Sequence, residues 1–158
     1  KGENIELSSN HSNKFEALLQ EEMHQNKPKK KTLKYWKTKI DKPFHEYVRR
    51  SKVNSEGYGQ CISCKKGIHF SESDAGHFIT RGALSTRWDV RNVNLQCRKC
   101  NRFEYGRQYE YSLALGSELS EEILIKSKQP LKLADFEYQE IFEEFRDKLK
   151  ALKDSQKF

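Results

Sequence analysis

The stretch Cys61-Ile-Ser-Cys64-Lys-Lys-Gly67 and its counterpart Cys97-Arg-Lys-Cys100 decide the fold of this 158-residue chain. The two thiolates of each CxxC pair converge on one ion, and the glycine after the first pair is expected to take the positive φ of the turn. Four thiolates complete a closed tetrahedral zinc site, which has no open position for chemistry and is therefore structural. The alternatives are a redox dithiol and thiols that are unrelated to one another.

The interval between the two pairs predicts what the zinc site supports. A plain zinc ribbon leaves ~15–20 residues there, and the interval from Cys64 to Cys97 is about twice as long. It has room for a strand–loop–strand insertion before the second pair starts a helix. We therefore expect an α+β fold, in which α-helices flank a zinc-stabilised, treble-clef-like core of knuckle, hairpin and helix.

The composition indicates why a metal is needed and what the chain binds. Hydrophobic residues make up 35% and charged residues 34% of the chain, which leaves little apolar material for a large core. The net charge of +7 points to polyanionic partners, nucleic acid first and an anionic membrane surface second. No apolar run approaches the ~18 residues that span a bilayer, and no secretory signal pattern is present. We therefore expect a cytosolic protein whose cysteines bind metal rather than form disulfides.

The first of three expected regions, residues 1–42, is basic and partly helical. A helix is predicted over residues 13–25, and residues 26–42 are rich in lysine. This lysine-rich stretch is either a solvated linker or a strip that contacts the DNA backbone. Trp36 within it is either a buried anchor or a side chain that stacks on an unpaired base. The candidate DNA-binding lysines are Lys29, Lys30, Lys31, Lys34 and Lys37.

Residues 43–117 form the expected zinc-bound core, and residues 118–158 form a linker followed by an amphipathic helix. Pro43 is expected to open a short helix, and a further helix is expected over residues 107–117, ending at Gly116. The C-terminal helix begins at Asp135 and packs either on the core or on a second subunit. Its apolar stripe comprises Phe136, Ile141, Phe142, Phe145, Leu149 and Leu152.

The residues between and just after the cysteine pairs resemble a known family. A histidine at the end of a strand, an asparagine shortly before a CxxC and a CxxC-Asn that opens a helix are similar to HNH (ββα-metal) nucleases. The fuller run GHFITRG (76–82), TRW (86–88), NVNLQC (92–97) and CNRF (100–103) resembles the NinG (Rap) family of phage recombination endonucleases. The match is best over residues 61–116. The resemblance implies a structure-selective endonuclease that cuts branched recombination intermediates such as Holliday junctions and D-loops.

The candidate roles at this site follow the chemistry of phosphodiester hydrolysis. His77, with an unperturbed pKa of about 6.5, is the candidate general base. Asn92 is expected to orient the ring of His77 through its side-chain carbonyl. Asp74 and Asn101 are the candidate ligands of a catalytic Mg²⁺ or Mn²⁺, since hard cations prefer oxygen ligands.

Two arginines complete the candidate site. Arg81, at the catalytic centre, and Arg87, toward the nucleic acid, are expected to clamp phosphate oxygens bidentately. Each assignment has a structural alternative. The arginines could pair with Asp89 or Glu104 instead, His77 could be a structural histidine, and Asn92 could cap a helix that begins near the second cysteine pair.

Three positions depart from the pattern of related proteins. Gly76 stands where common HNH proteins have an acidic ligand directly before the histidine. Asn94 stands where many relatives of the resembling family have a histidine, and Glu104 stands where some have a lysine. These departures bear on the ligand set of the catalytic cation rather than on the zinc scaffold.

The leading functional prediction is therefore a metal-dependent DNA endonuclease acting in the cytoplasm of the bacterial host. Its partners would be branched DNA and other phage recombination proteins, and a homodimer would suit a two-fold junction. The second hypothesis is a non-catalytic zinc module that binds DNA within a recombination complex. The third is an RNA-binding zinc protein. His77 discriminates among them, because a binding module needs no base beside a metal site.

Overall fold

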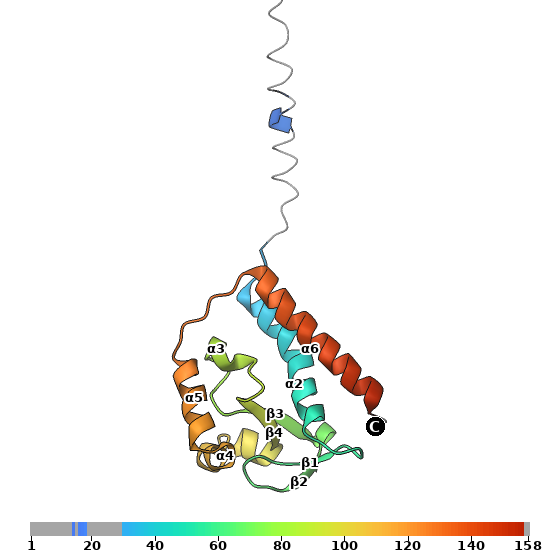
Figure 1. Ribbon diagram of the computed structural model, residues 1–158, viewed down its shortest axis with the longest axis vertical. Coiled ribbons are helices and arrows are strands. Elements are labelled where there is room, and N and C mark those ends of the chain that lie inside the picture. Colours follow the sequence, from blue (N-terminus) through green and yellow to red (C-terminus); the bar gives the residue numbers. More distant parts are fainter. Residues whose placement is uncertain (1–13, 15, 19–29, 157–158) are drawn as a thin grey trace, which may run out of the picture. The chain divides into compact units, whose positions relative to one another are not determined.

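A computed structural model of the chain describes residues 14, 16–18 and 30–156. The chain divides into two units, Lys1–Lys31 and Thr32–Phe158, and each is described by itself. In the first unit, residues 14 and 16–18 are helical and exposed. The rest of the helix expected over residues 13–25, and Lys29, lie outside the described residues. Apart from the exposure of Lys30 and Lys31, the remaining observations concern the second unit (Figure 1).

The helix α2 (Leu33–Ser51) is the first element of the second unit and contributes four residues to its hydrophobic core. It begins after Thr32, whose hydroxyl accepts the Tyr35 N–H at 3.2 Å, and it contains Pro43 in its interior. The prediction that Pro43 opens a short helix is therefore wrong, and the expected boundary at residues 42 and 43 falls inside α2. An interior proline costs ~3 kcal/mol, but each large apolar side chain buried from α2 contributes about 1.5–3 kcal/mol. Four such side chains occur at every fourth position: Trp36, Ile40, Phe44 and Val48.

The helix α6 (Asp135–Ser155) packs along α2, and the two helices run in the same direction (Figure 1). Near their first turns, the Trp36 Nε1–H donates to Asp135 at 2.9 Å. At their far ends, the Gln156 side chain donates to the Arg50 carbonyl at 3.0 Å. The sequence left open whether α6 packs on the core or on a second subunit, and the core is confirmed.

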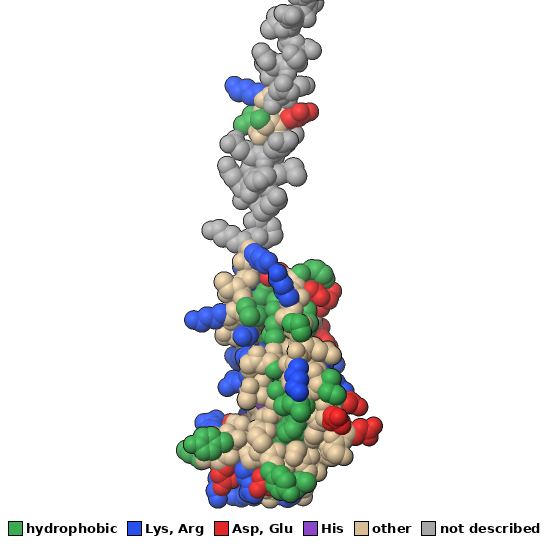
Figure 2. Space-filling model, turned by 90° about the vertical axis from the view of Figure 1, so that its left-hand side faces the viewer, with side chains coloured by type: hydrophobic (Ala, Val, Ile, Leu, Met, Phe, Trp, Pro, Cys, Tyr) green, Lys and Arg blue, Asp and Glu red, His purple; other side chains and the backbone are tan. Residues whose placement is uncertain are grey.

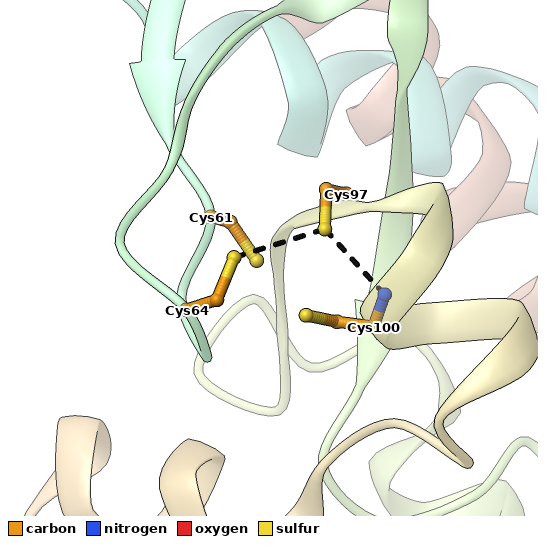
Figure 3. A group of neighbouring side chains, drawn as sticks. All are labelled: Cys61, Cys64, Cys97 and Cys100. Carbon is orange, nitrogen blue, oxygen red and sulfur yellow. Dashed lines mark hydrogen bonds between the residues drawn. The ribbon is translucent and has the colours of Figure 1, made fainter.

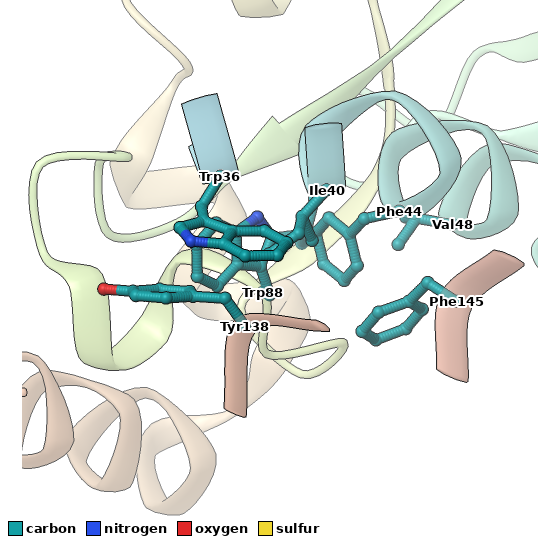
Figure 4. Close-up of a cluster of buried hydrophobic side chains, with 8 residues drawn as sticks. Trp36, Ile40, Phe44, Val48, Trp88, Tyr138 and Phe145 are labelled. Carbon is teal, nitrogen blue, oxygen red and sulfur yellow. The ribbon is translucent and has the colours of Figure 1, made fainter. Parts of the chain in front are cut away.

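The main hydrophobic core lies between these helices and the sheet that carries the candidate site (Figure 4). Tyr138 of α6 stacks on Trp36, with ring centroids 5.7 Å apart. Phe136, assigned to the apolar stripe from the sequence, is wrong in that role because it is 65% exposed. The core comprises Trp36, Ile40, Phe44, Val48, Trp88, Val93, Tyr138 and Phe145.

Two antiparallel hairpins follow α2 in the chain. Strands β1 (Tyr58–Gln60) and β2 (Gly67–His69) form the first, and the first cysteine pair lies between them. Strands β3 (Ser73–His77) and β4 (Val93–Cys97) form the second. The expected knuckle and hairpin are therefore present. The glycine of the knuckle, however, pairs within β2, and the preceding Lys65 takes the positive φ of 61°.

The 3-10 turn η1 (Phe70–Glu72) joins the two hairpins, and the loop between β3 and β4 contains α3 (Leu84–Arg87). Cys97 ends β4, Cys100 lies in the π-helical turn η2 (Lys99–Phe103), and α4 (Gln108–Leu115) follows. Gly116, at φ 86°, ends α4 as expected.

The helix α5 (Ser117–Ser127) comes next, where the sequence led us to expect a linker. It is anchored by Ile123, which is fully buried, and by the Lys126 carbonyl, which accepts the Ser85 hydroxyl at 2.8 Å. The molecule is thus a mixed α/β protein. Among the described residues, no helix has the length and apolar character needed to cross a membrane.

Candidate metal centre and adjoining cleft

The four cysteines lie together, as their spacing predicted (Figure 3). Cys61 and Cys64 come from the β1–β2 turn, Cys97 ends β4, and Cys100 lies in η2. Their sulfur atoms all lie within 4.8 Å of one another, and the Cys64 and Cys97 sulfurs are 3.8 Å apart. A tetrahedral zinc with Zn–S bonds of ~2.3 Å places its sulfurs about 3.8 Å apart. The donor set and its geometry therefore fit a structural zinc ion.

Backbone groups favour the thiolate form at Cys61, whereas burial raises the pKa of the Cys64 and Cys100 thiols, so a bound cation would have to stabilise those two as thiolates. Burial by itself raises the pKa of the Cys61 thiol. The backbone N–H groups of Cys64, Cys97 and Ser63 outweigh that effect, so the pKa of Cys61 is lowered. The Cys100 N–H also points at the Cys97 sulfur, at 3.5 Å. Such N–H groups stabilise a negatively charged sulfur and orient it.

A buried side chain connects the zinc knuckle to the strand that carries His77. The amide nitrogen of Gln96 donates to the Ser63 hydroxyl at 2.7 Å and to the Gly106 carbonyl at 2.6 Å. A Cβ atom on Gly76, which lies diagonally across from Gln96 in the β3–β4 register, would be only 2.0 Å from the Gln96 amide oxygen. Any side chain at position 76 would therefore displace this amide, which explains why no acidic residue stands directly before His77.

Asn94 belongs to the same buried layer. Its side-chain amide donates to the Tyr111 hydroxyl at 3.2 Å, and that hydroxyl donates to the Gly76 carbonyl at 2.9 Å. Asn94 is buried and does not line the cleft described next. It therefore holds α4 against the β3–β4 hairpin.

An open cleft of about 880 Å³ runs along β3 between α2 and η2. Its surface is strongly basic, because four arginines line it against one carboxylate; two histidines also line it. These side chains are His45, Arg49, Asp74, His77, Arg81, Arg98 and Arg102. Such a surface suits a phosphate-bearing ligand.

His77 lies at the end of β3 and is held from two sides. Its Nε2 is 3.1 Å from the Arg87 carbonyl, and its ring stands edge-on to that of His45, with centroids 5.3 Å apart. A carbonyl only accepts, so Nε2 carries the proton and Nδ1 keeps its lone pair. Burial, followed by the nearby charge of His45, lowers the pKa of His77 to about 4. The imidazole is thus neutral at pH 7.

The predicted contact between Asn92 and the His77 ring is wrong. Asn92 is fully buried. Its oxygen accepts the Ile79 N–H at 2.7 Å, and its nitrogen donates to the carbonyls of Ile79 and Thr86 at 2.9 and 3.0 Å. Asn92 therefore ties the end of β3 to α3, and the next carbonyl of α3, that of Arg87, contacts His77. The alternative that Asn92 caps the helix after the second cysteine pair is also excluded by these contacts.

Asp74 and Asn101 are brought together, as the sequence predicted. The Asn101 amide donates to Asp74 at 2.9 Å. Arg102 also binds Asp74, with both carboxylate oxygens engaged at 2.7 and 2.6 Å. Burial raises the pKa of Asp74, but these hydrogen bonds outweigh it and lower the pKa.

The oxygen atoms of Asp74 and Asn101 fit a hard cation in kind, although Arg102 already occupies the carboxylate. Over the described residues, the four cysteines form the only group of three or more His, Cys, Asp or Glu side chains whose ligand atoms converge. A catalytic cation would therefore depend on water and on phosphate oxygens for most of its ligands.

The two arginines have different environments. Arg87 is buried and binds both oxygens of Asp41, at 3.0 and 2.5 Å, and it also donates to the Arg81 carbonyl at 2.6 Å. The prediction that Arg87 clamps a phosphate is therefore wrong. The Arg81 side chain is exposed on the cleft, and no described residue forms a hydrogen bond or ion pair with it. It is available to a ligand.

Sequence reasoning missed the contribution of α2 to this site. Asp41, which binds Arg87 and accepts the Trp88 indole N–H at 2.9 Å, was not singled out, and neither were His45 and Arg49. The signal was present, because these three residues recur at every fourth position, each one step after a buried residue of α2: Ile40, Phe44 and Val48. One face of α2 packs into the hydrophobic core, and the adjoining face lines the cleft with His45 and Arg49.

The low pKa values of the paired histidines predict a dependence of stability on pH. Burial lowers the pKa of His45 to about 4, assisted by Arg81, Arg87 and Arg49 and opposed by Asp41. Unfolded histidines bind protons near pH 6.5, so the folded state loses stability as the pH falls from about 6.5 toward 4. We expect the free energy of unfolding to drop by roughly 2 kcal/mol for each histidine between pH 7 and 5.

Urea unfolding at both pH values, with zinc in the buffer, measures this drop. The His45→Gln variant is expected to lose about half of it. An identical pH dependence in His45→Gln and the unaltered chain would contradict the assignment to these histidines.

The chain is similar to the proteins of one known family. The model of one family, described as "NinG: Bacteriophage Lambda NinG protein", matches residues 4–155. The chain is 29% identical over 126 residues to "Protein ninG" of Salmonella phage P22, covering 77% of this chain and 59% of that protein. It is 26% identical over 125 residues to "Protein ninG" of Escherichia phage lambda, with the same coverage of 77% and 59%. The chain thus spans about three fifths of the length of these curated relatives. No solved structure matches it.

Proposed function

The chain belongs to the NinG family of bacteriophage proteins, and we propose that it is a metal-dependent endonuclease that cuts branched DNA intermediates of recombination. The single observation that carries the proposal is His77. Its imidazole is neutral, its Nε2–H is committed to the Arg87 carbonyl, and it lines a cleft rich in arginine. A structural histidine would not need a basic, open cleft beside it.

The chemistry assigned to the cleft is hydrolysis of one phosphodiester bond. The Nδ1 of His77 takes a proton from a water molecule, and the resulting hydroxide attacks the phosphorus as the P–O bond to the leaving oxygen breaks. Arg81, whose side chain has no hydrogen-bond or ion-pair partner among the described residues, binds a phosphate oxygen and offsets charge that develops there. A Mg²⁺ or Mn²⁺ ion held through Asp74 and Asn101 would supply further positive charge to the scissile phosphate.

We also propose an architecture for the core around the cysteine cluster. The β1–β2 knuckle, the β3–β4 hairpin and the turn η2 carry the cysteines, His77, Asn92 and Asn101 in the order that HNH (ββα-metal) nucleases would need. We assign them to a treble-clef-like core of that type. The zinc ion then sets the position of η2 relative to β3, and with it the positions of Asn101 and Asp74.

The second candidate is a zinc module that binds DNA without cutting it. The ion pair between Arg102 and Asp74 favours it, because a carboxylate already bound by a guanidinium is less available to a cation. In that case the cleft would bind phosphate, and His77 would serve only to pack against α2.

One assay separates the two candidates. A four-way junction and a linear duplex of equal length are incubated with the protein and Mg²⁺, Mn²⁺ or no added divalent cation, with zinc supplied throughout. The proposal expects nicks in the junction with Mg²⁺ or Mn²⁺ and none without them. Tight binding to the junction with no cleavage under any condition would contradict it and support the binding module.

The lysines of the N-terminal region give a further prediction about DNA binding. Lys30, Lys31 and Lys34 are exposed, whereas Lys37 is half-buried on α2 and Lys29 lies outside the described residues. Replacing Lys29, Lys30 and Lys31 together with Gln is expected to reduce the slope of log K against log salt by up to about three units, since each lost phosphate contact removes ~0.9 from it. Fluorescence anisotropy at several salt concentrations measures the slope.

A matched control replaces three exposed lysines of the C-terminal region, Lys132, Lys148 and Lys150, with Gln. This control keeps the same net charge as the first variant. Equal slopes for the two variants would show that the N-terminal lysines make no specific contact with the backbone.

The proposal also covers the partners and the place of action. Action in the cytoplasm of the bacterial host, contact with other phage recombination proteins, and a homodimer that matches a two-fold junction are expectations from the resemblance. They concern the whole protein of the family, of which the chain spans about three fifths.

A further inference from the structure

We infer that Tyr105 is a stacking platform for an unpaired base of the DNA strand held in the cleft, and that it supplies preference for branched over linear DNA. The inference rests on the proposed function, because it deepens the choice of substrate at the same site. It is carried by the exposure of Tyr105, the rigidity of its loop and the charge around it.

Tyr105 is the aromatic side chain of the cleft wall. It is 92% exposed and lines the cleft together with the neighbouring Gly106 and Gln108. Single exposed hydrophobic residues are common on proteins, but an aromatic ring at the mouth of a basic cleft has a ligand-sized space beside it. Figure 2 shows the side of the molecule that carries α4 and α5, where hydrophobic side chains stand at the surface among charged ones.

The loop that presents Tyr105 is held in a conformation that this residue adopts rarely. Its φ is 50°, and that of Arg107 is 46°, in the left-handed region that costs side-chain-bearing residues about 1–3 kcal/mol. The loop is fixed by Gly106, whose N–H donates to the Cys100 carbonyl at 2.8 Å. The Gly106 carbonyl accepts from the buried amide of Gln96 at 2.6 Å. The metal cluster and the β3–β4 hairpin therefore hold this loop directly.

A rigid loop matters because stacking on a mobile ring loses part of its free energy to ordering. The sequence offers no local reason for a tyrosine in a left-handed conformation, where glycine or asparagine is usual. Backbone strain of this kind persists only where the surrounding structure enforces it. The backbone therefore fixes the point beside the cleft from which the Tyr105 side chain extends.

The charges of the cleft indicate what stacks there. Arg49 and Arg98 also line the cleft, where their guanidinium groups donate to the carbonyls of Phe70 and Ser71 at 3.2 and 3.3 Å. Each retains further N–H donors for phosphate oxygens. A strand whose phosphates lie along these arginines brings its bases to the rim, where Tyr105 stands. Positive grooves with an aromatic platform are how proteins bind single strands.

The preference for branched over linear DNA follows from the way bases stack in each. In a continuous duplex both faces of every base are covered by its neighbours, so a protein ring has no face to contact. At a branch point the bases are unstacked more easily, and a free face becomes available. Tyr105 would then contribute to binding of a junction and add nothing to binding of a linear duplex.

The test measures binding without cleavage. Calcium replaces Mg²⁺, and a four-way junction and a linear duplex of equal length carry 2-aminopurine at the same sequence position, which is the branch point in the junction. We expect Tyr105→Ala to weaken junction binding by about 10-fold or more and to change duplex binding by less than two-fold. Tyr105→Trp is expected to keep junction binding, and the change in 2-aminopurine fluorescence on binding is expected only with an aromatic residue at 105.

Tyr109→Ala is the matched control. Tyr109 lies on α4, is 73% exposed and does not line the cleft, so its loss is expected to leave both affinities unchanged. An equal effect of Tyr105→Ala on both DNAs, or none on the junction, would overturn the inference. So would a dimer of the unaltered chain, seen by sedimentation, that Tyr105→Ala dissociates, because the ring would then belong to an interface between copies.

These outcomes are distinct from failure of the proposed function. If the unaltered protein binds the junction but cuts nothing with Mg²⁺ or Mn²⁺, the endonuclease proposal fails, and the Tyr105→Ala comparison still decides the inference. If it binds neither DNA, both fail together.

Discussion

The His77→Ala variant is expected to lose metal-dependent nicking of a four-way junction by roughly 10²–10⁴-fold, the contribution typical of a positioned general base. The reason lies in the tautomer. The Arg87 carbonyl holds the proton on Nε2 at 3.1 Å, so Nδ1 is the basic atom. Alanine removes that atom and leaves the arginines of the cleft in place. Junction affinity is therefore expected to stay within about three-fold.

Single-turnover nicking and anisotropy binding measure the two quantities separately. His69→Ala is the matched control, because His69 lies in β2, contacts Ser71 and does not line the cleft. A His77→Ala protein that binds zinc and melts cooperatively yet cuts at the original rate would remove His77 as the base.

The Cys97→Ser variant is expected to unfold the zinc-bound core. Cys97 ends β4 and places its sulfur 3.8 Å from that of Cys64, so it joins the hairpin to the knuckle. Structural zinc contributes an apparent ~10–16 kcal/mol in small metal-stabilised domains. Whole domains are stable by only about 5–15 kcal/mol. Loss of the ion therefore exceeds what the remaining core can offset.

Circular dichroism melting together with zinc analysis measures this effect. Lys99→Ser is the control within the same CxxC segment, since the Lys99 side chain is 78% exposed and meets only Glu104. The control is expected to keep one zinc ion and its cooperative melt. A Cys97→Ser protein that folds cooperatively without zinc would show that the cysteine cluster is not what stabilises the core.

The sequence predicted the parts of this molecule that depend on short-range patterns. The two CxxC pairs predicted the cysteine cluster, because the CxxC spacing places two thiols on one turn. The long interval between the pairs predicted the β3–β4 hairpin. Asp74 and Asn101 were predicted as ligands of one cation on the chemistry of their oxygen atoms, and their side chains do lie together. The family resemblance rested on residues 61–116 and is confirmed by a match over residues 4–155.

The errors concern contacts between residues far apart in the chain. Arg87 was expected to contact DNA. Its partner in the structure is Asp41, which lies 46 residues earlier. The start of the helix that carries Asp41 was misplaced, so no local pattern pointed to this ion pair. Pro43 suggested a helix start, but the buried stripe of α2 outweighs the cost of an interior proline. For Phe136, hydrophobicity alone indicated burial, whereas the packing of α6 on α2 buries Tyr138 instead. In each case tertiary packing decided what the local pattern left open.

The proposed core and its cleft depend most on a single zinc ion held by Cys61, Cys64, Cys97 and Cys100. X-ray absorption at the zinc edge, together with metal analysis of the purified chain, tests this directly. We predict one zinc ion per chain with four sulfur ligands at ~2.3 Å. A chain that folds with no bound zinc, or with nitrogen or oxygen in place of any of the four sulfurs, would contradict the account.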